Sequence, residues 1–397
     1  MQYDLVFEGG GAKGIVLVGA YQTFTEAGHT HSRLLGTSAG AITAALIAAG
    51  YTAQEMLAAL SEQENGRHVF AGFMGAPPPF SDEALRAGAL RAFLAAIDFK
   101  FIPNVVEDRL KEQVIQALAQ NPRTRSLVAL IERGGWYTAD RFVTWLQAKL
   151  DSGQRNGQPR RFSAMALQEF FDATHVELAV VAADTTSGQL LVLNHETAPR
   201  CPLVWAVRMS MSIPLLWDEV TWRSEWGPYL GRDLTGHVVV DGGLLSAFPI
   251  ELFISDQPQV TALMGPKRDD PILGMLIDES IEAPTPRGLL VDVRIKPEEL
   301  RTVQRIRGLI DTATSARDKM VIEAFEHLVV RLPAAGYGTT EFEMSEARRN
   351  ALLQGGRNAM RAYLERPPVA AVPRGEEDAA AAQAQQTADR IALKILS

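Results

Sequence analysis

Five consecutive residues near the N-terminus have the types and spacing of a catalytic serine turn: Gly36-Thr37-Ser38-Ala39-Gly40. A short apolar run precedes them and a longer one follows them. This context favours a sharp strand-to-helix turn in which the two glycines relieve crowding and the Ser38 hydroxyl projects as a nucleophile. The simpler alternative is that Ser38 only caps the helix, as serine often does.

A glycine-rich loop lies closer to the N-terminus, where the apolar run Leu5-Val6-Phe7 leads into Gly9-Gly10-Gly11-Ala12-Lys13-Gly14. The spacing also fits a dinucleotide-binding fingerprint, but that site needs an acidic residue about 20 positions further on, and residues 29–33 contain none. Lys13 is followed by glycine rather than serine or threonine, which excludes a P-loop. The remaining chemistry is to direct backbone N–H groups at a negatively charged oxygen.

A carboxylate stands at the end of a third apolar run, where Val238-Val239-Val240 is followed by Asp241-Gly242-Gly243. An aspartate at the end of a buried strand can reach into a cleft and act as a base. The alternative is an ordinary Asp-Gly turn. Together, the three segments supply a nucleophile, a base and oxyanion donors.

No histidine is well placed to complete a triad. His327 falls within a helical pattern and His237 would lie about 13 Å from Asp241 along an extended strand. The sequence therefore favours a Ser–Asp dyad. Cys201 is the chain's only cysteine, which excludes an intrachain disulfide and a multi-cysteine zinc site. We interpret it as a small buried hydrophobic residue rather than a nucleophile.

The elements that position these residues alternate between strand and helix. We expect strands over 5–7 and 33–35 and helices over 15–27 and 39–49, a pattern typical of a parallel sheet with helices on its faces. Residues 65–165 are predicted to form a mainly helical insertion. Further strands are expected over 178–182, 190–193, 237–240 and 289–295, and further helices over 298–327 and 346–364.

Composition limits the class of protein. The chain has 397 residues, of which 47% are hydrophobic and 22% charged, which is typical of a globular protein. Its formal charge of −8 argues against a nucleic-acid polymer as partner. The N-terminus lacks the basic region of a signal peptide, and the longest apolar stretch, 39–49, is too short to cross a bilayer. We expect a cytoplasmic protein with peripheral access to membranes.

The three motifs, in this order, resemble those of the patatin-like phospholipases of bacterial type. A further block, Ser210 to Trp217, has the family's serine followed four residues later by proline, although the family often has phenylalanine where Trp217 stands. Residues 136–140 also have counterparts in bacterial members. The resemblance covers roughly residues 3–250 and implies an α/β fold, with a mainly parallel central sheet in a three-layer α/β/α arrangement. The expected domain is 1–365, followed by a linker at 366–378 and a C-terminal helix at 379–397 that docks on the domain or contacts another copy.

The resemblance also implies roles for individual residues. Ser38 would be the nucleophile and Asp241 the general base, and the backbone amides of Gly10, Gly11 and Ala12 would form the oxyanion hole. No metal and no cofactor are expected. Lys13 would add positive potential, or would be a solvated lysine on the first helical turn. The supporting residues are Gly9, Lys13, Gly14, Gly36, Gly40, Pro214, Gly242 and Gly243.

Phenylalanine is concentrated in residues 70–101, which hold 6 of the 16 in the chain. One interpretation is a lid or interfacial face that meets acyl chains, with Phe70, Phe73 and Phe93 as the candidates. The alternative is that these rings form the core of the helical insertion.

The predicted function is hydrolysis of carboxylic esters in membrane phospholipids through an acyl-enzyme, which releases fatty acid and lysolipid. The alternatives are a lysophospholipase, a neutral-lipid lipase or a general esterase. A non-catalytic scaffold is disfavoured because Ser38, Asp241 and the glycine loop are all intact. Relatives include toxins and defence effectors, so an activating partner protein or small-molecule effector stays open, as does a homo-oligomer.

Overall fold

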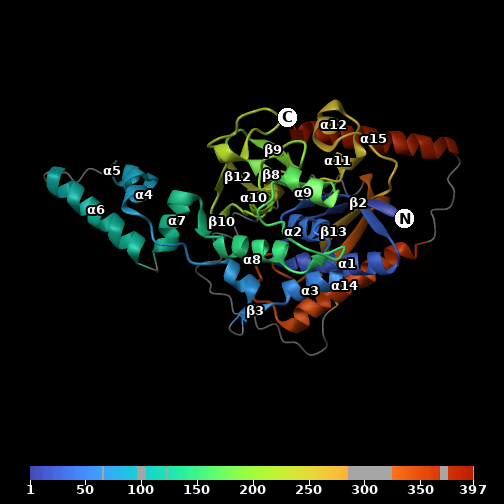
Figure 1. Cartoon of the computed structure of the whole chain (residues 1–397), viewed down its shortest axis with the longest axis horizontal. Helices are drawn as coiled ribbons and strands as arrows, with labels where there is room; N and C mark the ends of the chain where they lie inside the picture. Colours follow the sequence, from blue (N-terminus) through green and yellow to red (C-terminus); the bar gives the residue numbers. More distant parts are fainter. Residues whose placement is uncertain (65–66, 96–103, 122–123, 285–323, 367–373, 397) are drawn as a thin grey trace.

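A computed structural model describes residues 1–64, 67–95, 104–121, 124–284, 324–366 and 374–396 (Figure 1). Its central feature is a sheet whose strands follow the order β11-β12-β8-β2-β1-β13-β14, with β9 paired to β8. The parallel strands are β1 (Gln2–Phe7), β2 (Thr30–Thr37), β8 (Leu178–Asp184), β13 (Ile272–Glu282) and β14 (Val329–Ala335). The antiparallel strands are β9 (Gln189–Leu193), β11 (Val220–Thr221) and β12 (Val238–Asp241). The prediction of a mainly parallel sheet is confirmed.

Helices cover the two faces of this sheet (Figure 1). The helices on one side are α1 (Ile15–Glu26), α2 (Ala39–Ala48), α3 (Ala53–Leu60) and α14 (Glu346–Leu364). The helices on the other side are α11 (Glu251–Ile254), α12 (Pro258–Met264) and α15 (Arg374–Leu396). This is the predicted three-layer α/β/α arrangement. Within the described ranges, no helix combines the length and apolarity needed to cross a membrane.

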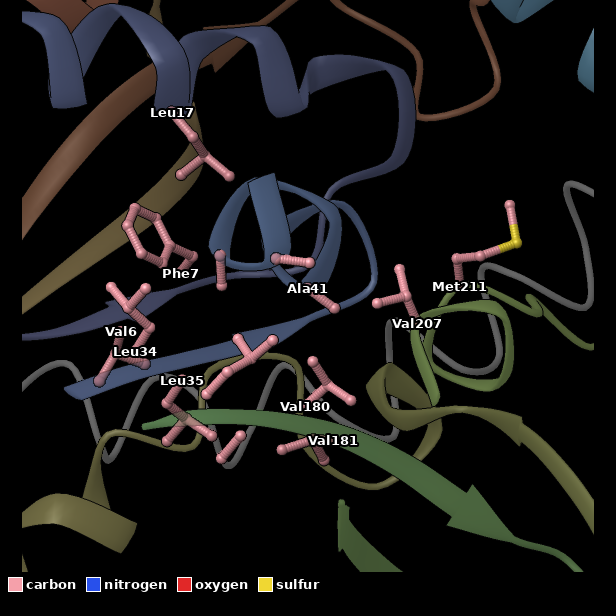
Figure 2. Close-up of a cluster of buried hydrophobic side chains, with 14 of the residues drawn as sticks. Val6, Phe7, Leu17, Leu34, Leu35, Ala41, Val180, Val181, Val207 and Met211 are labelled. Carbon is pink, nitrogen blue, oxygen red and sulfur yellow. The ribbon is translucent and has the colours of Figure 1, made fainter. Parts of the chain in front are cut away.

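The main core fills the space between the sheet and its helices. Figure 2 shows Val6, Leu35 and Val180 from three neighbouring strands among apolar side chains of α1, α2 and α10 (Leu203–Ser210). Strands that are covered on both faces read as continuous apolar runs rather than as alternating ones. That explains why short apolar stretches, and not alternation, marked β1, β8 and β12 in the sequence.

The segment predicted as a helical insertion contains α4 (Asp82–Ala87), α5 (Ala89–Ala95), α6 (Asn104–Gln120), α7 (Arg125–Arg133) and α8 (Asp140–Asp151). Helices α4 to α7 extend away from the body of the molecule and enclose a small apolar cluster of their own (Figure 1). Helix α8 instead joins the main core. The remaining elements are β3 (Gln63–Glu64), β4 (Arg67–His68), β5 (Gly135–Tyr137), β6 (Gln154–Arg155), β7 (Gln158–Pro159), α9 (Leu167–Thr174) and β10 (Leu215–Trp217).

Toward the C-terminus, one described strand was not expected and one helix begins earlier than expected. The strand predicted at 289–295 and most of the helix predicted at 298–327 lie outside the described residues. The sequence pattern does not predict strand β13, because Gly274 interrupts its apolar run. The structure gives the reason for this glycine: a Cβ on Gly274 would lie 2.3 Å from the Phe248 ring. Helix α15 begins at Arg374, ahead of the predicted 379, and docks on the domain through buried Ile391 and Ile395.

Helices α1 and α14 approach so closely that their contact requires glycine. A Cβ on Gly356 would lie 2.1 Å from the Val16 carbonyl oxygen. We therefore expect Gly356→Ala to destabilise the fold by about 1–3 kcal/mol through overpacking, although alanine is the better helix former by about 1 kcal/mol. Chemical denaturation measures the change, with Gln354→Ala, an exposed position on the same helix, as the control. Unchanged or increased stability in Gly356→Ala would contradict the close approach.

Candidate active site

Ser38 occupies a sharp turn between β2 and α2. Its backbone has φ 54° and ψ −118°, a conformation that non-glycine residues adopt only when the surrounding structure holds them there. Gly40 permits the turn, because a Cβ at that position would lie 2.1 Å from the Phe7 carbonyl oxygen. Ser38 stands at the N-cap position, but its side chain makes no capping hydrogen bond. The turn thus has the geometry of a nucleophile elbow.

Two strands end against each other beside this turn. On β8, one edge pairs with β9, and the other edge pairs first with β2 and then with β12. Thr37, the last residue of β2, lies opposite Val181, and Asp241, the last residue of β12, lies opposite Ala182. Because the two strands run toward each other along the same edge, their carboxyl ends meet. Ser38 and Asp241 are therefore brought together from positions 203 residues apart in sequence.

The Asp241 carboxylate is oriented by the loop that follows it. Its Oδ1 accepts a hydrogen bond from the Gly243 N–H at 2.7 Å. Gly242 allows the loop to pass β8, since a Cβ there would lie 2.4 Å from the Val181 carbonyl oxygen. The Asp-Gly turn considered as an alternative is thus present, and its hydrogen bond orients the carboxylate at the end of β12. Asp241 is 4% exposed and Ser38 is 6% exposed.

The glycine loop reaches the same point from β1. A Cβ on Gly9 would lie 3.1 Å from Ser38 Cβ, so the loop passes directly against the serine turn. In the part of the chain that the structure describes, the Gly10 and Gly11 N–H groups have no hydrogen-bond acceptor. The Ala12 N–H, by contrast, donates to the Thr339 carbonyl oxygen at 2.7 Å. The Ala12 amide is therefore already engaged, whereas its role as an oxyanion donor stays a prediction.

Lys13 has a different environment from either one expected. It lies in a 3-10 turn over Gly11–Gly14, is 2% exposed, and forms an ion pair with Glu279 of β13. The interpretation as a solvated lysine is wrong. The carboxylate also offsets the positive potential that Lys13 was expected to add. Next to it, a Cβ on Gly14 would lie 2.8 Å from Ala39 Cβ, so the starts of α1 and α2 lie close together.

Sequence reasoning missed two polar groups behind the serine turn. The Ser210 hydroxyl accepts a hydrogen bond from the Ser38 N–H at 3.0 Å, and the fully buried Arg208 donates to Ser212. Burial is the largest influence on the pKa of the Arg208 guanidinium and lowers it, while the neighbouring Asp218 opposes this effect. Pro214 follows in the same segment, before β10. The two serines of the Ser210–Trp217 block can be read from the sequence. The residues that they bind, Ser38 and Asp241, are distant in sequence, so these contacts could not be predicted.

A pocket lies beside the glycine loop, and its walls are mainly apolar. Its apolar lining includes Ala12, Ala39, Leu60, Phe70 and Phe342. Phe70 thus lines this pocket, whereas its role in a lid or interfacial face stays a prediction. Phe73 instead is 2% exposed and packs against Phe70, Phe142 and Trp145, which makes it a core residue rather than an exposed lid residue. Phe93 belongs to α5, and its side chain lies outside the described part of the molecule.

The remaining candidates for chemistry lie elsewhere. His237 pairs with Asp184, its Nδ1 lying 2.8 Å from Oδ2. His327 is exposed in a short turn over Glu326–Leu328. Cys201 is completely buried, and burial raises the pKa of its thiol, which suits a packing role rather than a nucleophilic one.

Several known proteins are similar to this chain in sequence or structure. A protein of Bacillus subtilis, YqhO, is 27% identical over 372 residues that cover 92% of this chain and 99% of the relative. An NTE family protein of Mycobacterium tuberculosis is 38% identical over 86 residues, 22% of this chain and 13% of that protein. Among solved structures, VipD from Legionella pneumophila is similar with a TM-score of 0.43 and 16% identity over 91% of this chain and 66% of VipD. At this TM-score the likeness carries no argument.

The family assignment comes from the match to a family model. Residues 5–254 match the model of the patatin-like phospholipases, and this span contains all three motifs whose ends meet at the site. The chain therefore belongs to the patatin-like phospholipase family, which indicates a lipid ester hydrolase.

Proposed function

We propose that this protein hydrolyses carboxylic esters of membrane phospholipids through a dyad of Ser38 and Asp241. The observation that supports the proposal is that two strands end against each other on one edge of β8, one leading into the strained Ser38 turn and the other ending at the buried Asp241. The glycine loop that packs against the same turn supplies backbone N–H donors. Nucleophile, base and oxyanion donors are the three parts that acyl transfer requires.

In the proposed reaction, Ser38 Oγ attacks the ester carbonyl carbon while its proton passes to the Asp241 carboxylate. The oxyanion that forms accepts hydrogen bonds from the Gly10 and Gly11 amides. The C–O bond then breaks, and the leaving lysolipid oxygen takes the proton from Asp241. Water attacks the resulting acyl-enzyme, again losing a proton to Asp241, and Ser38 recovers its proton as the fatty acid departs.

A free aspartate, with a pKa near 3.9, is a weak base for this step. Burial favours the neutral carboxyl over the carboxylate and so makes the carboxylate a stronger base. Asp241 is 4% exposed. The apolar pocket beside the glycine loop is the place where an acyl chain would leave water.

Product release from lipid vesicles tests this function. Wild-type protein should release fatty acid and lysolipid from phosphatidylcholine and phosphatidylglycerol vesicles, and the products, identified by mass spectrometry, show which ester is cut. Pretreatment with a fluorophosphonate that labels active serines should abolish the release. Turnover of triacylglycerol emulsions or lysolipid without turnover of diacyl phospholipid would instead indicate a lipase or a lysophospholipase. Release that survives complete labelling would contradict a serine mechanism.

A further inference from the structure

The hydroxyl of Ser210 holds the main chain of the proposed nucleophile. It accepts a hydrogen bond from the Ser38 N–H at 3.0 Å and donates one to the Val181 carbonyl oxygen at 2.6 Å. Val181 is the β8 residue opposite the end of β2. Ser210 is completely buried, so its hydroxyl rather than bulk solvent satisfies the Ser38 N–H. The strained backbone of Ser38 is thus tied to the strand that also carries the end of β12.

Two residues further on, the same turn holds the proposed base. The Ser212 carbonyl oxygen accepts a hydrogen bond from the Asp241 N–H at 2.9 Å. Residues 210–212 therefore contact one main-chain atom of each dyad member. A shift of this turn would move the two residues relative to each other, which changes the distance that proton transfer depends on.

A buried guanidinium fixes the conformation of the turn. Arg208 donates from Nη1 to the Ser212 hydroxyl, and this hydroxyl donates to the Arg208 carbonyl oxygen at 2.6 Å. Nη2 binds the Asp218 carbonyl oxygen at 2.8 Å and Oδ1 at 2.5 Å. A buried charge is tolerated only when its donors are satisfied, so any other arrangement of the turn that breaks these bonds is disfavoured. These hydrogen bonds therefore favour the observed conformation of the turn.

We propose that Ser210 is a positioning residue for ester hydrolysis, acting through the main chain of Ser38, within a turn that also sets the place of Asp241. This inference rests on the proposed dyad. Ser210 does not touch the reacting atoms; it fixes where the nucleophile stands. Misplacement of a reacting group by about 1 Å can cost about 10²-fold in rate, while substrate binding is little affected.

The test measures kcat and KM for p-nitrophenyl butyrate, a soluble ester, with wild type and Ser210→Ala. We expect kcat to fall by about 10–100-fold, with KM close to the wild-type value, because only the alignment of the nucleophile changes. Ser210→Thr keeps the hydroxyl and should restore most of kcat. Ser210→Cys places a weaker hydrogen-bonding group in the same space and should give a kcat between those of wild type and Ser210→Ala. It takes the place of Ser210→Ala in the test if that variant folds poorly.

Thr197 offers a matched control away from the site. Its buried hydroxyl also accepts a backbone N–H, from Asn194 at 3.1 Å, and donates to a backbone carbonyl oxygen, that of Val192 at 2.5 Å. Thr197→Val removes the same two kinds of hydrogen bond with little change in volume. It should lower the melting temperature about as much as Ser210→Ala does, yet leave kcat unchanged.

The outcomes separate the two proposals. Wild-type kcat in folded Ser210→Ala, or an equal loss of kcat in Thr197→Val, would overturn the positioning role while leaving the dyad intact. A wild-type protein that hydrolyses no ester, or a Ser38→Ala protein that hydrolyses it as fast as wild type, would overturn the proposed function and this inference together.

Discussion

Replacing Ser38 by alanine should lower kcat/KM for p-nitrophenyl butyrate by about 10⁴-fold or more, because the acyl-enzyme can no longer form. The rate enhancement that remains would come from the oxyanion donors and from substrate binding alone. Alanine has the same Cβ at φ 54° as serine, so the backbone strain is unchanged. The side chain makes no capping hydrogen bond that alanine would lose. We therefore expect a folded protein with an unchanged melting temperature.

Ser255→Ala is the matched control for this experiment. Ser255 is also a buried serine, but its hydroxyl binds Asp389 of α15, away from the site. That variant should keep wild-type turnover. Intact-mass analysis after fluorophosphonate treatment should show one adduct in wild type and in Ser255→Ala, and none in Ser38→Ala. An adduct that persists in Ser38→Ala would place the nucleophile at another residue.

Replacing Asp241 by asparagine should lower kcat for the same ester by about 10²–10⁴-fold, the usual contribution of a general base. Asparagine has nearly the same shape, and its amide oxygen can still accept the Gly243 N–H, so the loop should keep its place. What is lost is the ability to take the Ser38 proton. The expected signature is a fall in kcat with KM close to the wild-type value.

Asp389→Asn provides the comparison for Asp241→Asn. It makes the same change in a carboxylate whose Oδ1 binds Ser255. Its turnover should equal that of wild type. Should folded Asp241→Asn also retain wild-type kcat, the base would have to be another group and the dyad assignment would be wrong. The rate of fluorophosphonate labelling gives a second readout, since it should slow in Asp241→Asn and not in Asp389→Asn.

The sequence by itself determined the local conformations on which the site depends. The glycines on either side of Ser38 and after Asp241 marked tight turns in the sequence, because glycine tolerates main-chain conformations and close approaches that other residues do not. Which main chain each glycine approaches, such as Phe7 beside Gly40, is seen only in the fold. Short apolar runs before each motif indicated buried strands, and β1, β2, β8 and β12 all lie where such runs were noted. Helix 346–364 was predicted with the bounds that α14 has.

The contacts that make a site from these parts were decided only by the tertiary structure. That β2 and β12 end against each other on one edge of β8 depends on strand order and register, which no single segment encodes. The Ser210 bond to Ser38, the engagement of the Ala12 amide by Thr339 and the ion pair of Lys13 with Glu279 each join residues more than 150 positions apart. A short-range sequence pattern indicates the secondary structure that one segment prefers. The distant partner that satisfies a buried N–H or charge is determined only when the whole core packs.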